Sequence, residues 1–240
     1  MDSFVYYDQS KVTTVSELKT SITNGLLTYG SSTDLNKFGG RFKYSKMLNV
    51  IDNIDDAITS NITRVRIRRN LKALINQFAQ YELCFGNSFY INPEGKNVKT
   101  TGFTIQGQSD MLYITDIPNK NGDGTLDGSG KGTLTIVKGD IELSENRLIV
   151  ASAGTVDYVH GEIILNTINI TSTEKANNII EIQTFPQSND VIGLKDLYLT
   201  FAVGDSTINM VKDTITSGEQ ISGVGYKVTS SYSNGALTRG

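Results

Sequence analysis

The residues whose spacing comes nearest to a binding motif form an oxygen-rich loop over residues 119–127. Its possible ligands stand at positions 1, 3, 5 and 9 of a calcium loop and are Asn119, Asn121, Asp123 and Asp127. Gly124 occupies position 6, as such loops require, but position 12 is Gly130 in place of a bidentate glutamate. Without that carboxylate the charge is too low for tight binding. The pattern therefore favours a mobile hairpin tip, and we predict no metal centre.

Nucleophiles and bases are sparse. His160 is the only histidine, which excludes a zinc site built on two or three imidazoles and leaves a serine or cysteine nucleophile one possible base. Its position before Gly161 in a predicted turn favours a surface residue. Cys84 stands between Leu83 and Phe85, so we predict a buried and unreactive thiol.

Paired carboxylates leave one enzymatic class open. Asp55–Asp56 and Asp140 with Glu142 offer such pairs, and a glycosidase requires only two carboxylates about 5–9.5 Å apart. Asp55–Asp56 stands at a predicted helix end, where solvated acids are common. The glycine-rich stretch 218–225 lacks the Lys-Ser/Thr pair of a phosphate loop. We therefore predict no catalytic residue and no cofactor, and keep hydrolysis of cell-wall glycans or peptides as an alternative.

The strongest charge pattern is a stripe of arginines on a predicted strand over residues 62–68. Val65 and Ile67 face a core in this pattern, while the arginines that point the other way are Arg64, Arg66 and Arg68. Such a stripe can follow the phosphates of a nucleic acid. However, residues 91–240 hold 17 acidic against 11 basic residues, and the chain lacks tryptophan and nucleic-acid motifs. We therefore predict a solvated face or ion pairs with another subunit, and no nucleic-acid partner.

An aromatic and cationic connector precedes that strand. Residues 37–44 interleave aromatic rings and cations around Gly39–Gly40, where glycine permits turn conformations closed to other residues. Residues 1–90 hold 11 basic against 8 acidic residues, so the two parts of the chain carry opposite net charge and copies can attract each other at short range. We predict subunit contacts at the connector, the stripe and a C-terminal arm. The predicted interface residues are Phe38, Arg41, Phe42, Tyr44, Arg64, Arg66, Arg68 and Tyr226.

Two amphipathic helices and flanking strands are predicted to position these residues. A strand covers Phe4–Tyr7, and a helix begins at the capping-box spacing of Thr14 and Glu17 and ends at Gly30. Its apolar face consists of Leu18, Ile22, Leu26 and Tyr29. A second helix, capped by Ser45, is predicted to end near Asp55–Asp56. Its apolar residues are Met47, Leu48, Ile51 and Ile54. Together these elements predict a small α+β unit over residues 1–87.

Short alternating apolar runs over residues 88–216 predict a mainly antiparallel β domain. The predicted strands are 111–114, 133–137, 148–150, 161–165, 179–184 and 197–203, with a hairpin turning at His160–Gly161. Residues 71–78 fit a helix or a strand and stay undecided, and Ile208–Ile215 fit a helical turn or a strand. Residues 217–240 hold few apolar anchors, which are Ile221, Val224, Tyr226 and Val228, so we predict an extended arm lying on a neighbour. The fold class is therefore α+β.

Composition supports a globular protein. The 240 residues are 38% hydrophobic and 20% charged, with 23 glycines and 3 prolines, which suits strands and tight turns. No apolar run approaches the roughly 20 residues that cross a bilayer, and the N-terminus lacks the pattern of a secretory leader. We predict no membrane partner. The single cysteine excludes an internal disulfide and fits a reducing compartment such as a bacterial cytoplasm.

Several strings along the chain, in order, resemble a known family. They lie at residues 34–46, 50–52, 57–61, 84–87, 154–158, 185–190 and 230–233. Their order and spacing resemble the central baseplate wedge subunits of T-even-type contractile-tailed bacteriophages, in the baseplate J-like family. The resemblance runs from about Thr14 to the end and corresponds to the C-terminal part of longer members.

The resemblance implies a structural role without catalysis. Subunits of this family dimerise and join neighbouring wedge and hub proteins. They close into an inner ring, so copies of the subunit contact one another as a dimer or a ring. The ring couples a change of baseplate shape to sheath contraction. The implied location is the tail baseplate of the virion, after assembly in the host bacterial cytoplasm. A different class stays open, in which the β domain is a carbohydrate-binding or adhesin module with Tyr90, Tyr113 and Tyr158 as stacking platforms.

Overall fold

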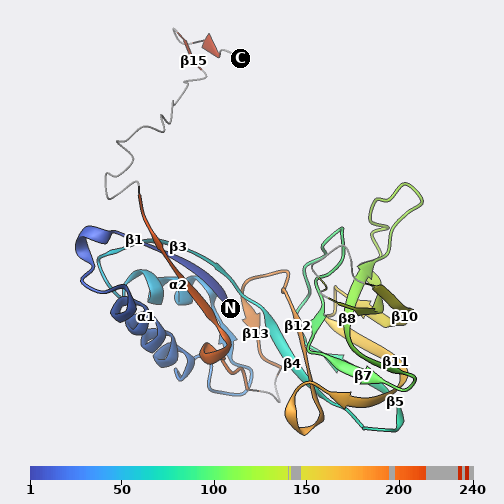
Figure 1. Ribbon diagram of the computed structural model, residues 1–240. Coiled ribbons are helices and arrows are strands. Elements are labelled where there is room, and N and C mark those ends of the chain that lie inside the picture. The colour runs from blue at the N-terminus through green and yellow to red at the C-terminus, as the bar shows by residue number, and fades with distance from the viewer. Residues whose placement is uncertain (140, 142–146, 195–197, 215–231, 234–235, 238–240) are drawn as a thin grey trace.

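Two hydrophobic cores organise the chain, which has the α+β fold that the sequence predicts (Figure 1). The computed structural model describes residues 1–139, 141, 147–194, 198–214, 232–233 and 236–237. None of the helices in these ranges is long and apolar enough to cross a membrane. One core lies between two helices and a three-stranded sheet, and the other fills a small β-barrel.

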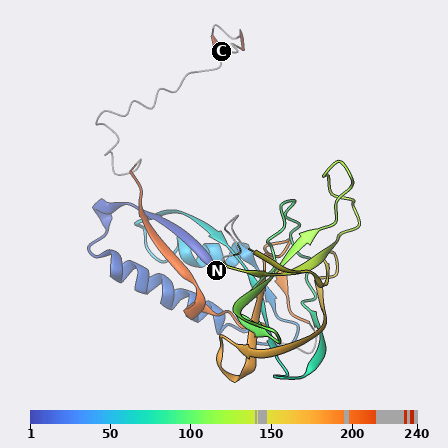
Figure 2. The ribbon, with the colours of Figure 1, turned by 45° about the vertical axis from the view of Figure 1, so that its right-hand side comes forward.

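The first core lies under helices α1 (Val15–Gly30) and α2 (Tyr44–Asp52). The sheet has the order β14 (Thr207–Lys212), β1 (Asp2–Tyr7), β3 (Ile58–Arg64), in which β1 runs antiparallel to β3 and parallel to β14. Figures 1 and 2 show both helices on the same side of this sheet. A 3-10 turn, η1 (Gln9–Lys11), links β1 to α1.

Helix α1 confirms the predicted period. Its buried residues are the predicted ones, Leu18, Ile22, Leu26 and Tyr29. Thr14 is the N-cap, although its side chain makes no capping hydrogen bond. Helix α2 differs from the prediction at both ends, since Lys43 is the N-cap and Ser45 lies inside the helix. It ends at Asp52, and beyond this end Asp55 accepts a hydrogen bond from the Ala57 backbone N–H in the turn that leads to β3.

The predicted strand over residues 62–68 is wrong in one respect, because it is broken in the middle. β3 ends at Arg64, and after two intervening residues β4 (Ile67–Lys72) begins in a different sheet. Val65 is buried in the first core, whereas Ile67 packs against both cores. The chain crosses from one core to the other at this break.

The second core fills a barrel in which five strands close on themselves. The ring consists of β7 (Phe103–Ile105), β8 (Gln108–Pro118), β9 (Lys131–Lys138), β10 (Arg147–Asp157) and β11 (Glu162–Thr173). The β10–β11 pairing closes the ring, and β5 (Phe78–Cys84) adds to the outside of β11. Beside the barrel, β12 (Ile179–Thr184) pairs with β4 and β6 (Lys99–Thr100), and η2 (Ala176–Asn178) precedes it.

The predicted hairpin at His160–Gly161 is confirmed as the β10–β11 connection. The undecided residues 71–78 form the end of β4, a turn and the start of β5, and Ile208 lies in strand β14. The predicted strand at 197–203 is wrong over its described part. Tyr198 makes only an isolated bridge, and a 3-10 turn, η3 (Val203–Asp205), follows.

The α+β unit draws on residues far apart in the sequence, where the prediction has one continuous stretch ending at residue 87. β14 belongs to the sheet of β1, and Val191, Val203 and Ile208 lie in the first core. A short pairing of β2 (Arg41–Phe42) with β13 (Val191–Ile192) adds a second long-range link. Of the predicted arm, the structure describes β15 (Tyr232–Ser233) paired with β16 (Ala236–Leu237), and the rest lies outside the described residues.

Candidate functional site

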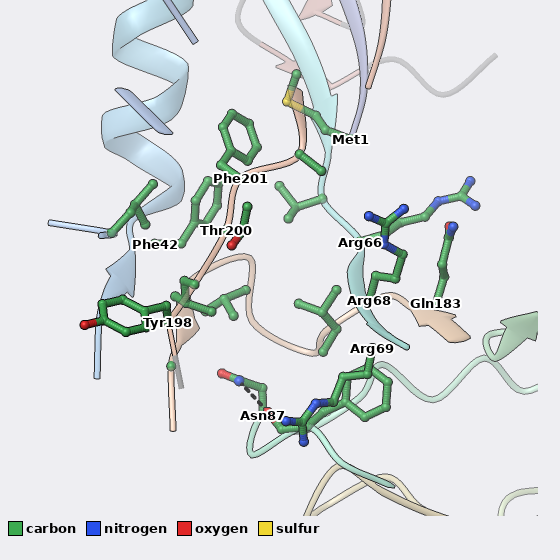
Figure 3. A pocket seen from close by; sticks show the side chains of 18 of the residues that line it. Met1, Phe42, Arg66, Arg68, Arg69, Asn87, Gln183, Tyr198, Thr200 and Phe201 are labelled. Carbon is green, nitrogen blue, oxygen red and sulfur yellow. Dashed lines mark hydrogen bonds between the residues drawn. The ribbon is translucent and has the colours of Figure 1, made fainter. Parts of the chain in front are cut away.

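A cavity of about 640 Å³ lies between the two cores, lined by polar residues on one side and aromatic residues on the other. Arg66, Arg68 and Arg69 reach it from the crossing segment and β4, while Phe42, Tyr198 and Phe201 form the facing wall (Figure 3). The arginines come from the chain that leads from the first core to the second, Tyr198 and Phe201 from the chain between β13 and β14, and Phe42 from the first core itself. The cavity therefore brings Phe42 together with two arginines of the predicted stripe.

Arg66 ties the two cores together. Its Nη2 donates to Asp2 Oδ2 in β1 at 3.0 Å, and its guanidinium carbon lies 4.7 Å from the centre of the Phe185 ring beyond β12. Its Nε is buried without a hydrogen-bond partner among the described residues. The side chain thus spans the crossing point, and its charge is balanced within the chain.

Arg68 makes a second link of the same kind. Its Nη1 donates to Glu181 Oε1 in β12 at 3.1 Å and to Asp205 Oδ2 in η3 at 2.8 Å. The neighbouring Arg69 donates from its guanidinium to the backbone carbonyl of Cys84. Because the Arg68 side chain is only 30% exposed, its pairs are less screened than surface ones, but each contributes no more than about 1 kcal/mol.

These contacts correct the predicted stripe. Arg64 belongs to β3 and Arg68 to β4, so the strand break removes the single face that the alternation predicts. Arg64 is exposed and makes no ion pair within the described part of the chain, whereas Arg66 and Arg68 bind acidic residues of their own chain. Of these three arginines, only Arg64 is exposed and makes no ion pair with the described residues.

The connector separates into buried and exposed residues. Phe42 is 5% exposed and packs on Tyr29 and Phe201 with ring centres 6.0 and 5.6 Å away. Tyr44 donates its hydroxyl to the Thr63 carbonyl at 2.6 Å. Both residues therefore hold the first core together.

Phe38 and Arg41 are the exposed members of the connector. Phe38 is 60% exposed and stacks on Tyr198, itself 53% exposed, with ring centres 4.2 Å apart. Arg41 is exposed on β2, and its cross-strand partner Ile192 is 50% exposed. Phe38, Tyr198 and Ile192 form an exposed apolar surface beside a cation, which we call the aromatic patch.

Asn87 is a contact residue that the sequence does not reveal. Its Nδ2 donates to the Ile192 carbonyl at 2.8 Å and its Oδ1 accepts from the Ile192 N–H at 2.9 Å. This pair of bonds imitates a strand pairing and joins a loop of the barrel to β13. An asparagine in a turn carries no signal for such a remote partner.

The barrel contains a buried acid that the sequence also conceals. Asp116 Oδ2 accepts from the Tyr158 hydroxyl at 2.6 Å, and its Oδ1 accepts from the Val98 N–H at 2.6 Å. Burial raises the pKa of Asp116 and, together with the adjacent carboxyl, that of Tyr158. Because Tyr158 is 1% exposed, it cannot serve as a stacking platform, whereas Tyr90 is half exposed. The carbohydrate alternative therefore loses one of its three platforms.

The remaining candidates behave as local structure. Asp123 and Asp127 accept hydrogen bonds from Thr125 and Ser129 within the β8–β9 loop, and these bonds lower the pKa of each acid. Across the residues that the structure describes, no group of three or more His, Cys, Asp or Glu side chains could hold a metal ion. The His160 side chain is 70% exposed, as predicted for a turn.

Cys84 differs from its prediction. Leu83 and Phe85 are buried, and because successive strand residues point to opposite faces, Cys84 points outward and is half buried. Its Sγ lies 3.7 Å from Glu162 Oε1. Burial and that carboxylate raise the pKa of the thiol, which makes it a poor nucleophile.

The comparison with protein families concerns the first part of the chain. Residues 1–70 match the family model for baseplate structural protein gp6, C-terminal domain III. The match supports a phage baseplate protein. The matched region contains β1, α1, α2, β3 and the arginines of the crossing, but not β14. The chain matches no curated protein. A structural role, a place in the virion tail baseplate and assembly with other baseplate proteins are all supported by this family, whose description is structural rather than enzymatic.

Proposed function

We propose that the chain is a structural subunit of a baseplate wedge in a contractile-tailed phage, that it associates with itself, and that it binds neighbouring wedge and hub proteins. The observation that carries this proposal is the family match over residues 1–70, which coincides with the helices and two strands of the first core. In this proposal copies of the subunit contribute to the inner ring of the baseplate, which is built in the host cytoplasm.

The surface of the first core supports an assembly role. The aromatic patch exposes two stacked rings and Ile192 next to Arg41. Aromatic side chains and arginines are enriched at protein interfaces, where an apolar contact is combined with directed hydrogen bonds. Phe38, Arg41 and Arg64 are therefore the proposed contact residues for other subunits. Phe42, Tyr44, Arg66 and Arg68 act indirectly, because they hold the shape of that surface. Tyr226 lies outside the described residues and enters the proposal only through the arm.

The links between the cores support a role in transmitting movement. Arg66 joins β1 to the segment after β12, Arg68 joins β12 to η3, and Asn87 joins the barrel to β13. A displacement of one core would be passed to the other through these contacts. We propose that this coupling contributes to the change of baseplate shape that accompanies sheath contraction.

Light scattering of the purified full chain, followed by co-purification with the other wedge proteins of the same phage, tests this function. We expect oligomers or stable complexes, and no turnover of cell-wall glycans. Phe38→Asp should weaken assembly at least tenfold, because a charge replaces an exposed ring in the aromatic patch. Tyr90→Asp, which alters a half-exposed ring on the barrel, is the matched control. A chain that stays monomeric at high concentration and binds no wedge protein would contradict the proposal.

A further inference from the structure

The outer face of β5 and β11 carries two acids that have no cation partner. Glu82 and Cys84 point outward from the barrel because Leu83 between them lies in its core, and successive strand residues alternate between faces. Glu162 of β11 is the cross-strand neighbour of Cys84 and shares this face. Neither glutamate makes an ion pair with a residue that the structure describes.

An exposed aromatic ring lies on the same face. Phe78 stands four residues before Glu82 on β5, so it also points outward, and it is 70% exposed. The pKa of the Cys84 thiol is raised by burial and then by Glu162 and Glu82, which outweigh the opposite effect of Arg69. The charge around this strand pair is therefore negative. We call Phe78, Glu82 and Glu162 the acidic face.

The aromatic patch lies among charges of the opposite sign. Its surrounding cations are exposed and make no ion pair within the described ranges, and they are Lys37, Arg41 and Lys43. The acids nearby already have partners. Asp34 pairs with Lys46, and Asp190 accepts the backbone N–H of Tyr44. The patch therefore combines exposed rings with an excess of positive charge.

We propose that the aromatic patch of one copy of this chain packs on the acidic face of a second copy. The exposed rings of the two surfaces meet, and the cations of the patch face the two glutamates. Phe78 and Glu82 are four strand residues apart, about 13 Å, and Phe38 and Arg41 are three residues apart, within about 11 Å. A ring and a charge on each surface are thus spaced to make both contacts together. The inference rests on the proposed self-association and specifies its contact.

Charge complementarity favours a second copy as the occupant, because one chain carries both halves of the contact. Opposite charges that approach within a Debye length, about 8–10 Å, attract and fix the register of an interface, while buried aromatic rings supply most of the affinity. Within a single copy the two surfaces do not meet. Phe38 stacks on Tyr198, and in the described parts of the chain no ring contact or ion pair joins the aromatic patch to the acidic face.

An exchange of charge between the two surfaces tests the contact in the full chain. The patch variant carries Lys37→Glu with Arg41→Glu, and the face variant carries Glu82→Lys with Glu162→Lys. None of these four side chains is buried, so circular dichroism should show that both variants fold. Each variant alone should self-associate at least tenfold more weakly in sedimentation experiments, because like charges then face each other. An equimolar mixture should associate within threefold of the unsubstituted chain, because the reversed patch meets the reversed face.

Matched controls separate this contact from an effect of net charge. Lys19→Glu with Lys120→Glu changes the net charge as the patch variant does, and Glu17→Lys with Glu94→Lys changes it as the face variant does. All four of these residues are exposed, and both controls should alter self-association less than threefold. An equal loss in the controls would overturn the inference.

The remaining outcomes distinguish this contact from the proposed function. If the patch and face variants associate as the unsubstituted chain does, or if their mixture does not recover, the contact is refuted while the proposed function stands. A chain that is monomeric by itself but binds wedge proteins through the aromatic patch would also refute the contact and leave the function in place. A chain that neither associates nor binds wedge proteins would refute both.

Discussion

Replacing Tyr158 by phenylalanine tests the buried acid of the barrel most directly. The substitution removes only a hydroxyl, which donates to Asp116 Oδ2 at 2.6 Å, while both side chains are buried. Asp116 Oδ1 retains the hydrogen bond from the Val98 N–H. The variant therefore leaves one carboxyl oxygen without its donor in a site that water does not reach.

The expected loss depends on the charge of Asp116. A buried hydrogen bond to a charged group contributes about 1.5–3 kcal/mol, and one between neutral groups about 1 kcal/mol. Burial raises the pKa of Asp116 above its usual value of 3.8. The folded carboxyl thus takes up its proton at higher pH than the unfolded one. The cost of burying the ionised carboxyl is absent below the unfolded pKa, where both states hold the proton, and it grows as pH rises through the folded pKa.

The Tyr158 hydroxyl opposes that cost because it favours the ionised form. Its removal should raise the pKa of Asp116 further, so Tyr158→Phe destabilises most above the folded pKa, by about 2 kcal/mol, and about half as much near pH 3. For a chain of this size, 2 kcal/mol corresponds to a fall in Tm of about 4–8 °C. Urea denaturation at pH 8 and pH 3 measures both values.

Tyr90→Phe is the control, because its ring is half exposed and makes no hydrogen bond through its hydroxyl within the described residues. This control should remain within about 0.5 kcal/mol of the unsubstituted protein at both pH values. The reasoning is refuted if Tyr158→Phe matches the control at pH 8, or if its loss is greater at pH 3 than at pH 8.

Three further perturbations follow from the packing. Arg68→Ala should lower stability by about 1 kcal/mol in urea denaturation, since its pairs are partly exposed, and should increase hydrogen exchange around Asp205. Gly161→Ala should lower the free energy of unfolding by more than about 2 kcal/mol, because φ is +69° and a Cβ would lie 2.0 Å from a backbone oxygen. Gly124 has a φ of +84° but open space around it, so Gly124→Ala should lower it by only about 1 kcal/mol in the same assay. Arg64→Glu should leave the circular dichroism spectrum and Tm unchanged while weakening assembly measured by light scattering, and a loss of folding would contradict its exposed placement.

The predictable parts of the fold are those set by local periodicity. Leu18, Ile22 and Leu26 recur at the helical period, and only one face of α1 can be buried, so the sequence specifies that face. Alternating runs around a glycine specify the β10–β11 hairpin in the same way, because Gly161 supplies a positive φ that other residues resist. The exposed position of His160 follows from that turn.

The candidate site was less predictable, because its members need partners that are remote in the chain. The alternation around Arg64, Arg66 and Arg68 predicts one charged face, but β3 ends at Arg64 and β4 begins at Ile67 in a different sheet, so the arginines separate. The residue types alone predict Phe42 and Tyr44 as contact residues. The burial of Phe42 and the hydroxyl contact of the partly buried Tyr44 depend on Phe201 and Thr63, which local pattern cannot locate.

By itself, the sequence determined which segments become helices and hairpins and that the protein has an α+β fold, because neighbours within a few residues decide those periods. Tertiary structure alone decided that β14 pairs with β1, that Arg68 meets Asp205, and that Asp116 receives the Tyr158 hydroxyl. Each of these contacts joins residues dozens to hundreds of positions apart. Many such pairings satisfy the same local pattern, and only the simultaneous packing of both cores selects one of them.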